Sequence, residues 1–345
     1  MTNQNLTPLF SLGEFGLIER LTGNHTPVRP STLKGVGDDA AMLDYGSNMV
    51  LVSTDLLIEG VHFDLTYYPL KHLGYKAVAV NLSDICAMNG TPEQITVSIA
   101  LSSKFSLEAV EEIYKGIYHA CQNYQVDLVG GDTTSSQIGL IISVTVLGSA
   151  QKNEVVYRNG AKENDLICVT GDLGAAYAGL LILEREKAVF KADPQMQPEL
   201  EGMDYLLQRQ LKPEPRYDMV KLLKEKEILP TAMIDVSDGV ASDIRHIANQ
   251  SNLGCVIYED KLPIFQTTYD QLGLLKIDPT TAALNGGEDY ELLFTINQND
   301  YDKIKDHNDI HVIGYMTDPS EGYHLISKSG TKAELKAQGW DALKK

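Results

Sequence analysis

The sequence contains little cysteine, and its cysteines are not clustered. Cys86, Cys121, Cys168 and Cys255 are spread over 345 residues, with no Cys-x-x-Cys pair and no histidines at the spacing of a zinc site. This pattern excludes a recognisable zinc finger. It predicts reduced, partly buried thiols, as in a cytoplasmic protein.

Basic residues are also scarce. The chain has 29 Lys and Arg residues against 47 Asp and Glu residues, a formal net charge of −18, and no basic stripe. A nucleic-acid surface needs such a stripe to displace counterions from phosphates, so we expect no nucleic-acid partner. A nucleotide or phosphate ligand is compatible with this charge if metal cations bridge the ligand to the acids.

Long apolar runs are missing as well. The longest, "GAAYAGLLIL" and "GLIISVTVLG", reach about ten residues, whereas a helix that spans a membrane needs about 18. The first residues, "MTNQNLTPLF", have neither the basic start nor the apolar stretch of a signal peptide. We therefore expect a soluble cytoplasmic protein with no membrane partner.

The common motifs of phosphate and acyl-transfer chemistry are absent. The sequence has no G-x-x-x-x-G-K-[ST] loop, no G-x-G-x-x-G, no H-R-D or D-F-G pair and no G-x-S-x-G elbow. An enzyme of this composition that acts on phosphates must therefore depend on metal ions.

What the sequence does contain is typical of a globular protein with two domains. Hydrophobic residues make up 43% of the chain and charged residues 22%, and 345 residues suffice for two domains of roughly 150. The polar, turn-rich stretch "SAQKNEVVYRNGAKEND" predicts a boundary between residues 1–152 and 153–345. Strand and helix patterns predict a mixed α/β first domain and an α/β or α+β second domain.

Aspartates recur where predicted strands end or turn. Taken singly, each is explained as a turn former or a helix N-cap. Gathered at one site without cations, they would repel one another by several kcal/mol, so the set predicts a shared Mg²⁺ site if the fold brings them together. Hydroxyl groups of Ser53, Thr54 and Ser237 would add neutral oxygens. The aspartates are Asp38 and Asp39 in "GVGDD", Asp55 in "LVSTD", Asp132 in "LVGGD", and Asp235 and Asp238 in "MIDVSD".

Asp84 differs because it lies within a predicted helix, in the apolar stretch "AVNLSDICAM". Aspartate is a poor residue for a helix interior, and burial of its charge is expensive without a partner. Asp84 either faces solvent or reaches from the helix to the metal site, and the apolar setting fits the second interpretation better.

Four other features have an ordinary structural interpretation, and three of them also have a functional one. "GGEDYELLF" is either an ordinary strand start or a turn that exposes Glu288 and Asp289 at its lip. His62 is a lone histidine, typical of a surface. Arg158 either neutralises an anion or lies on the surface. Trp340, the single tryptophan, either packs a core or closes over a flat aromatic ligand.

Eight motifs in order resemble those of the thiamine-monophosphate kinases, a family in the superfamily of aminoimidazole ribonucleotide synthetase. The resemblance runs from about residue 11 to Trp340, and each motif alone is only moderately specific. The motifs are "LGEFGLI", "GVGDDAAML", "VSTDLLIEGVHF", "NLSDICAMNGTP", "LVGGDTT", "RNGAK", "DVSDGVASD" and "GGEDYELLF".

The resemblance implies a two-domain α/β plus α+β fold whose N-terminal sheets pair across a homodimer. It implies Mg²⁺-dependent transfer of the γ-phosphoryl group of ATP onto thiamine monophosphate, with several ions per site. Carried over by position, the metal ligands are Asp39, Ser53, Thr54, Asp55, Asp84, Asp132, Asp235 and Asp238. The ATP contacts are Tyr114, Gly131, Asp132, Arg158 and Ser237, and the thiamine phosphate contacts are His62, Glu288 and Trp340.

The chemistry needs no general acid or base, and none is assigned. A phosphate monoester has a second pKa near 6, so the acceptor oxygen is largely ionised at pH 7. The obstacle is the approach of two anions, which metal ions and positioning overcome. The alternatives are another ATP-using enzyme of the superfamily, of the aminoimidazole ribonucleotide synthetase or selenophosphate synthetase type, and a non-catalytic protein that binds metal or nucleotide.

Overall fold

The computed structural model describes residue 16 and residues 30–338, except 35–36 and 47. Trp340 and most of the motif "LGEFGLI" lie outside the described residues.

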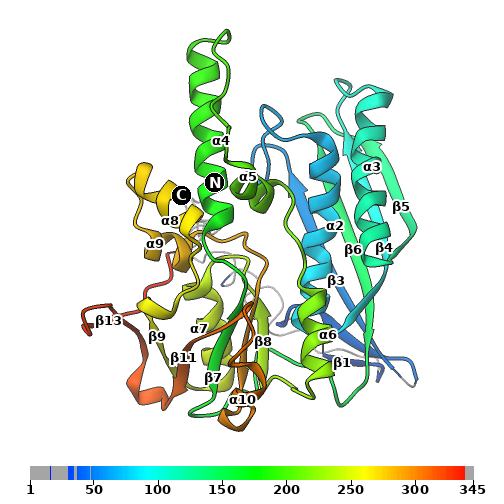
Figure 1. Cartoon of the computed structure of the whole chain (residues 1–345). Coiled ribbons are helices and arrows are strands. Elements are labelled where there is room, and N and C mark those ends of the chain that lie inside the picture. The colour runs from blue at the N-terminus through cyan, green and yellow to red at the C-terminus, as the bar shows by residue number, and fades with distance from the viewer. Residues whose placement is uncertain (1–15, 17–29, 35–36, 47, 339–345) are drawn as a thin grey trace, which may run out of the picture.

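Two mixed sheets with helices agree with the expected two-domain architecture (Figure 1). The first sheet has the strand order β1-β2-β3-β6-β4-β5. Its strands are β1 (Thr32–Lys34), β2 (Ala41–Asp44), β3 (Met49–Ile58), β4 (Thr91–Leu101), β5 (Asp127–Ser135) and β6 (Ile141–Ala150).

Helices α2 (Leu70–Ala87) and α3 (Leu107–Tyr124) cover one face of this sheet. As expected, α3 begins after Ser106, whose hydroxyl accepts a hydrogen bond from the Ala109 amide (3.3 Å). The two helices touch through glycine: a Cβ on Gly74 would lie 2.0 Å from the carbonyl oxygen of Ile113. This close approach leaves α2 almost wholly buried.

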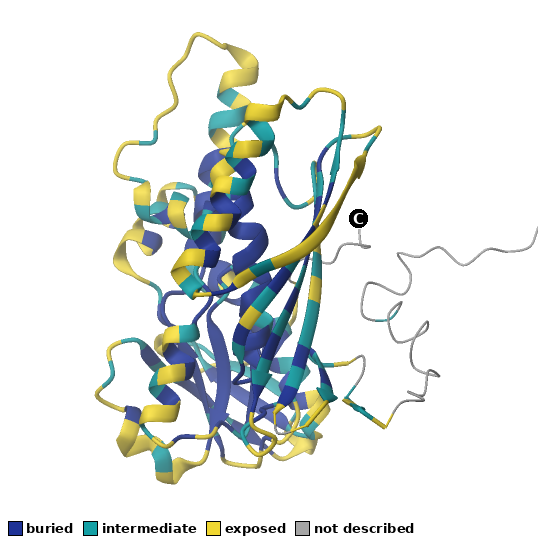
Figure 2. Cartoon of the chain, turned by 90° about the vertical axis from the view of Figure 1, so that its right-hand side faces the viewer, coloured by how far each residue is buried: buried dark blue, intermediate teal, exposed yellow. Residues whose placement is uncertain are grey.

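The opposite face of the first sheet is open. Residues of β6 alternate between buried and half-buried, and β5 is exposed along nearly its whole length (Figure 2). Leu56 on β3 is 48% exposed and Val129 on β5 is 60% exposed. Exposed apolar side chains on an open sheet face are typical of an association surface.

The second sheet has the order β13-β12-β9-β11-β7-β10-β8. One face packs against α7 and α9, and the other against α6, while α4, α5 and α8 pack together beside α9. The strands are β7 (Leu166–Thr170), β8 (Ala232–Asp235), β9 (Gly254–Tyr258), β10 (Leu292–Ile296), β11 (Ile310–Thr317), β12 (Tyr323–Ile326) and β13 (Lys332–Glu334). The helices are α4 (Ala175–Ala192), α5 (Asp204–Leu211), α6 (Tyr217–Glu225), α7 (Val240–Ser251), α8 (Gln266–Leu274), α9 (Pro279–Asn285) and α10 (Tyr301–Ile304).

Helix α2 joins the two domains. Figure 1 places it between α3 and helices α5 and α6 of the second domain, and it also contacts β8. Cys86 and Ala87 at its C-terminal end share one apolar cluster with Met233 and Phe294 of the second sheet. Polar residues in the middle of α2 therefore face the junction of the domains. The predicted division at residues 152 and 153 falls between β6 and β7 and stays a prediction.

All four cysteines are buried and none forms a disulfide, in line with the expected reduced thiols. No helix among the described residues is long and apolar enough to cross a membrane.

Candidate active site

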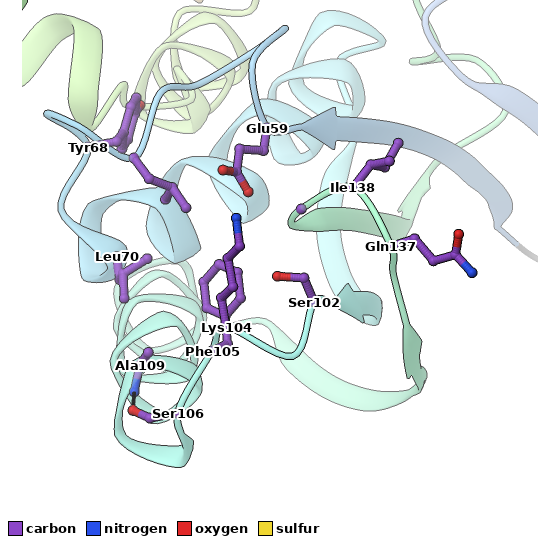
Figure 3. A pocket seen from close by; sticks show the side chains of 12 residues that line it. Glu59, Tyr68, Leu70, Ser102, Lys104, Phe105, Ser106, Ala109, Gln137 and Ile138 are labelled. Atoms are coloured by element: carbon purple, nitrogen blue, oxygen red, sulfur yellow. Dashed lines mark hydrogen bonds between the residues drawn. The ribbon is translucent and has the colours of Figure 1, made fainter.

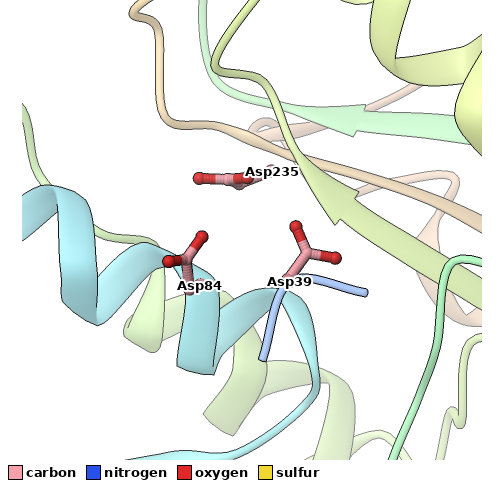
Figure 4. A group of neighbouring side chains, drawn as sticks. All are labelled: Asp39, Asp84 and Asp235. Atoms are coloured by element: carbon pink, nitrogen blue, oxygen red, sulfur yellow. The ribbon is translucent and has the colours of Figure 1, made fainter. Parts of the chain in front are cut away.

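Three predicted metal ligands meet at the junction of the domains. Asp39 comes from the turn before β2, Asp84 from the last turn of α2 and Asp235 from the end of β8 (Figure 4). One oxygen from each carboxylate lies within 4.8 Å of the others. Asp84 therefore points into the site rather than to solvent, as its apolar neighbours indicated.

Hydroxyl groups on neighbouring elements orient two of these carboxylates. Ser53 on β3 donates a hydrogen bond to Oδ2 of Asp84 (2.5 Å), and Ser83 on α2 donates one to Oδ2 of Asp235 (2.6 Å). Because Ser83 and Asp84 are adjacent on α2, one helical turn contacts strands of both sheets. Preorganised oxygens of this kind are typical of a hard-cation site.

Arg158 binds the third carboxylate in bidentate geometry. Its Nε and Nη2 donate hydrogen bonds to Asp39 at 2.9 and 2.8 Å, and its side chain is 17% exposed. The backbone amide of Arg158 also donates to Asp38 (3.3 Å). Arg158 is thus fixed beside the acids rather than spread on the surface, and Asp38 supports the turn that carries Asp39.

The charge of the site is not balanced by the protein. Burial, followed by the neighbouring carboxylates Asp55, Asp235 and Asp39, raises the pKa of Asp84 well above its usual value. Burial and then Asp39 raise the pKa of Asp235 to about 7. Oxygen ligands with excess negative charge are what Mg²⁺ prefers, so the residues fit the expected metal.

The carboxylates line a cleft of about 470 Å³, which leads into a second cavity of about 580 Å³. Arg158 lines the cleft beside Asp39, whereas Lys76 pairs with Glu288, which together with His62 also lines the second cavity. The second cavity has aromatic walls that include Tyr67, Tyr68 and Tyr177. Five residues line both spaces, namely His62, Ser237, Asp238, Glu288 and Tyr290.

His62 is held neutral at the mouth of the second cavity. Its Nδ1 accepts a hydrogen bond from the Ile58 amide (3.0 Å), which leaves the ring proton on Nε2. Burial lowers the pKa of His62. The neutral ring therefore offers a hydrogen-bond donor rather than a positive charge.

The segment "GGEDYELLF" is a turn, but only one of its two expected acids is at the lip. Glu288 lines the cleft with φ of 58°, and Gly287 has φ of 70°. The interpretation that exposes Asp289 at the lip is wrong, because Asp289 is 1% exposed. Its carboxylate accepts hydrogen bonds from the amides of Gly174 and Ala176 at the start of α4 (2.8 and 3.4 Å), which draws the side chain inward.

Other predicted site residues lie near the carboxylates without joining the group of three. Asp55, Asp238 and Ser237 line the same cleft. Thr54 lines it too, but its hydroxyl donates to the Val144 carbonyl oxygen on β6 (3.0 Å). Strand alternation turns Thr54 away from α2, because Ser53 and Asp55 on either side of it face that helix.

Three predicted residues are not brought to the cleft of this chain. Asp132 and Gly131 lie on the edge strand β5, with β4 and β6 between them and β3. Asp132 is exposed and in register with Ser98 on β4. Tyr114 is half-buried on α3, where its ring lies 6.0 Å from that of Tyr118. A single chain therefore assembles only part of the expected set.

A further cavity of about 670 Å³ lies between three loops of the first domain (Figure 3). Lys104, Phe105 and Ser102 come from the loop before α3, and Glu59 follows β3. Glu59 is the only carboxylate among the described residues that line it. No predicted site residue lines this cavity, so its size does not mark it as the metal centre.

Sequence reasoning missed Lys76 and Tyr290. Both line the cleft, and Lys76 is 1% exposed. Lys76 lies in "YKAVAV", on the same helix as Asp84 and in an equally apolar setting. The argument applied to Asp84, that a charge in an apolar helix needs a partner, could have found Lys76 as well.

Comparison with known proteins identifies the class and then the family. Residues 37–150 match the model for the N-terminal domain of AIR synthase related proteins, and residues 162–326 match that for the C-terminal domain. The fold and the acidic cleft are thus those of an AIR synthase-related protein. Within that class, the chain belongs to the thiamine-monophosphate kinase family.

The relatives support this family over nearly their whole length. The chain is 35% identical to the thiamine-monophosphate kinase of Bacillus subtilis (strain 168), covering 96% of this chain and 100% of that protein. It is 34% identical to that of Escherichia coli (strain K12), covering 95% and 98%. A solved structure of AaThiL complexed with AMPPCP and TMP superposes with a TM-score of 0.82 at 32% identity, covering 98% of this chain and 99% of the other.

Proposed function

We propose that this cleft carries out the reaction of its family, the ATP-dependent phosphorylation of thiamine monophosphate to thiamine diphosphate. The observation that carries the proposal is the meeting of Asp39, Asp84 and Asp235, for which the described residues provide one ion pair, between Arg158 and Asp39. An unbalanced group of carboxylates suits an enzyme that must bring two anionic phosphates together through cations.

Magnesium is the cation that this donor set favours. Asp39, Asp84 and Asp235 would hold it, and Ser53 and Asp55 lie beside them in the cleft. When bound, magnesium neutralises phosphate charge and aligns donor and acceptor. We extend the ligand set to Thr54, Asp132 and Asp238 on the resemblance of their motifs.

The chain's own residues bind and orient the two substrates. Arg158 is already ordered by Asp39, so it offers a fixed guanidinium to the phosphates of ATP at one end of the cleft. Ser237, which follows β8, lines the same cleft. His62 and Glu288 lie toward the aromatic cavity, which suits the organic part of thiamine monophosphate. Trp340 is assigned to the same substrate, and Tyr114 and Gly131 to ATP, from the resemblance alone.

Transfer is direct, and the protein supplies no general base. The acceptor phosphate is already ionised near pH 7. His62 is neutral, and its Nε2 proton makes it a hydrogen-bond donor rather than a base. The described residues thus act by positioning and charge, consistent with phosphoryl transfer.

We also propose that the protein is a homodimer that pairs the open faces of its first sheets. The open face carries exposed apolar side chains such as Leu56 and Val129. Asp132 lies on this sheet but away from the cleft of its own chain, so pairing offers a way for β5 of one chain to approach the cleft of the other. A cytoplasmic location stays a prediction.

The test is to incubate purified protein with ATP, Mg²⁺ and thiamine monophosphate, and to follow thiamine diphosphate by mass spectrometry. We expect stoichiometric formation of thiamine diphosphate and ADP, abolished by a chelator of divalent cations. Absence of product, together with turnover of a precursor of aminoimidazole ribonucleotide, would reject the proposal in favour of another enzyme of the superfamily.

A further inference from the structure

Lys76 is a buried lysine whose ammonium group contacts a proposed substrate residue. Its side chain is 2% exposed, and its Nζ lies 3.0 Å from Oε1 of Glu288. Nζ also donates a hydrogen bond to the carbonyl oxygen of Gln210 (3.2 Å) and lies 5.7 Å from the centre of the Tyr68 ring. Burial of an ammonium group is unfavourable without a charged partner, so Lys76 and Glu288 depend on each other.

Gln210 holds the second oxygen of the same carboxylate. Its Nε2 donates a hydrogen bond to Oε2 of Glu288 (2.7 Å). Lys76 comes from α2 of the first domain and Gln210 from α5 of the second, so residues of both domains bind the carboxylate of Glu288. The backbone of Glu288 is fixed as well, because its amide donates to the Ser237 carbonyl oxygen (2.7 Å) and its φ is 58°.

The geometry leaves Glu288 able to contact a ligand. Its side chain remains 29% exposed and faces the aromatic cavity that adjoins the cleft. A carboxylate has about four lone-pair sites, and Lys76 and Gln210 occupy two of them. The remaining sites can accept hydrogen bonds from donor groups on the organic part of the acceptor substrate.

We propose that Lys76 and Gln210 are positioning residues that fix the carboxylate of Glu288 for recognition of the acceptor. This inference rests on the proposed function of the cleft. Lys76 acts through Glu288 and does not touch the reacting phosphates. Its loss therefore weakens binding of thiamine monophosphate, while the ATP end of the cleft, formed by Arg158 and Asp39, is unaffected.

The first test is the kinetics of Lys76→Met. We expect KM for thiamine monophosphate to rise at least about tenfold, with kcat, KM for ATP and the Mg²⁺ requirement each changed by less than about threefold. Lys303→Met is the matched control, because Lys303 pairs with Asp300 (2.8 Å) far from the cleft, and its KM values should equal those of the wild type. An equal rise in both substrate KM values would overturn the proposal.

Gln210→Met provides a second variant that leaves all charges in place. It removes one donor to Glu288, and we expect a smaller rise in KM for thiamine monophosphate, about threefold to tenfold. Thermal unfolding of each variant checks its fold. If Lys76→Met does not fold, Gln210→Met carries the test, and an unchanged KM for thiamine monophosphate in this variant would overturn the proposal.

A double-mutant cycle separates positioning from a general packing role. In a Glu288→Gln background, Lys76→Met should change KM for thiamine monophosphate by less than about twofold, because the group through which it acts is already altered. Independent, additive effects of the two substitutions would overturn the proposal. Inactivity of the wild-type protein toward thiamine monophosphate would instead reject the proposed function, so the two failures are distinguishable.

Discussion

Two groups of acids in this protein, each with at least one buried carboxylate, differ in how their charge is balanced. The first is the cleft group, Asp39, Asp84 and Asp235. The second, here named the arginine cluster, is formed by Arg209, Arg216, Asp218, Glu291 and Asp309. The cleft group has one arginine contact, whereas both arginines of the second group bind Glu291.

The consequences for the two groups are opposite. In the cleft, the causes that follow burial in raising the pKa of Asp84 are all other carboxylates. In the arginine cluster, Glu291 is 2% exposed but accepts hydrogen bonds from Thr170 (2.6 Å) and from both arginines. Acid content therefore does not identify a metal site. A metal site is instead distinguished by how few protein cations lie within contact distance of its acids.

One sequence segment serves both groups. In "GGEDYELLF", Glu288 faces the cleft, Asp289 faces the start of α4, and Glu291 enters the arginine cluster. The segment thereby connects the substrate end of the cleft to the arginine cluster. Substitutions that act on the cleft should therefore change catalysis, and substitutions that act on the arginine cluster should change stability.

The largest expected effect is on catalysis, from Asp84→Asn in the cleft. This variant removes one carboxylate from the group of three, and we expect the fold to be kept and turnover to fall about 1,000-fold, equivalent to about 4 kcal/mol. In Mg²⁺-free buffer the variant should be more thermally stable than the wild type, because one unbalanced buried charge is gone. Near-normal turnover at saturating Mg²⁺ would show that Asp84 is not a metal ligand.

The next effect is on stability, from Glu291→Gln in the arginine cluster. This substitution leaves Arg209 and Arg216 without their shared buried carboxylate, and we expect the free energy of unfolding to fall by about 3 kcal/mol. The Mg²⁺ concentration for half-maximal activity of the folded protein should not change. Denaturant unfolding and Mg²⁺ titration together check both parts, and a shifted Mg²⁺ requirement would contradict the contrast between the two groups.

The smallest effect is a pH dependence of stability without Mg²⁺. Because burial raises the pKa of Asp235 from 3.8 to about 7, its contribution to stability is present below about pH 4 and is lost as the pH rises to about 7. Asp235→Asn removes the ionisable group and with it this loss of stability at higher pH. The variant should match the wild type near pH 4 and exceed it by on the order of 2 kcal/mol near pH 8, measured by denaturant unfolding.

An equal stability difference between Asp235→Asn and the wild type at both pH values would contradict this interpretation. The comparison of variant with wild type is needed because other groups titrate in the opposite sense. Burial lowers the pKa of His246 to about 4, for example, so its contribution to stability increases with pH.

Local patterns in the sequence were sufficient for several elements and ligands. The N-cap at Ser106 and the anomalous charge of Asp84 each depend on neighbouring residues only. The expected strand end at Asp55 is wrong, because β3 continues to Ile58 and Asp55 lies within it. The same patterns misplaced Asp289, because its partners, the amides of Gly174 and Ala176, lie more than 100 residues away in the chain. They also missed Lys76, whose partner Glu288 is equally remote.

The sequence by itself determined that the chain is acidic and lacks phosphate-binding loops, and its ordered motifs determined the family. Those properties depend on composition and on short runs of residues. Only the tertiary structure decided that Asp39, Asp84 and Asp235 share one site while Asp132 stays on a distant strand, and that Glu291 is neutralised while Asp84 is not. The physical reason is that Coulomb energy depends on distance and burial, which folding sets between residues that are far apart in the chain.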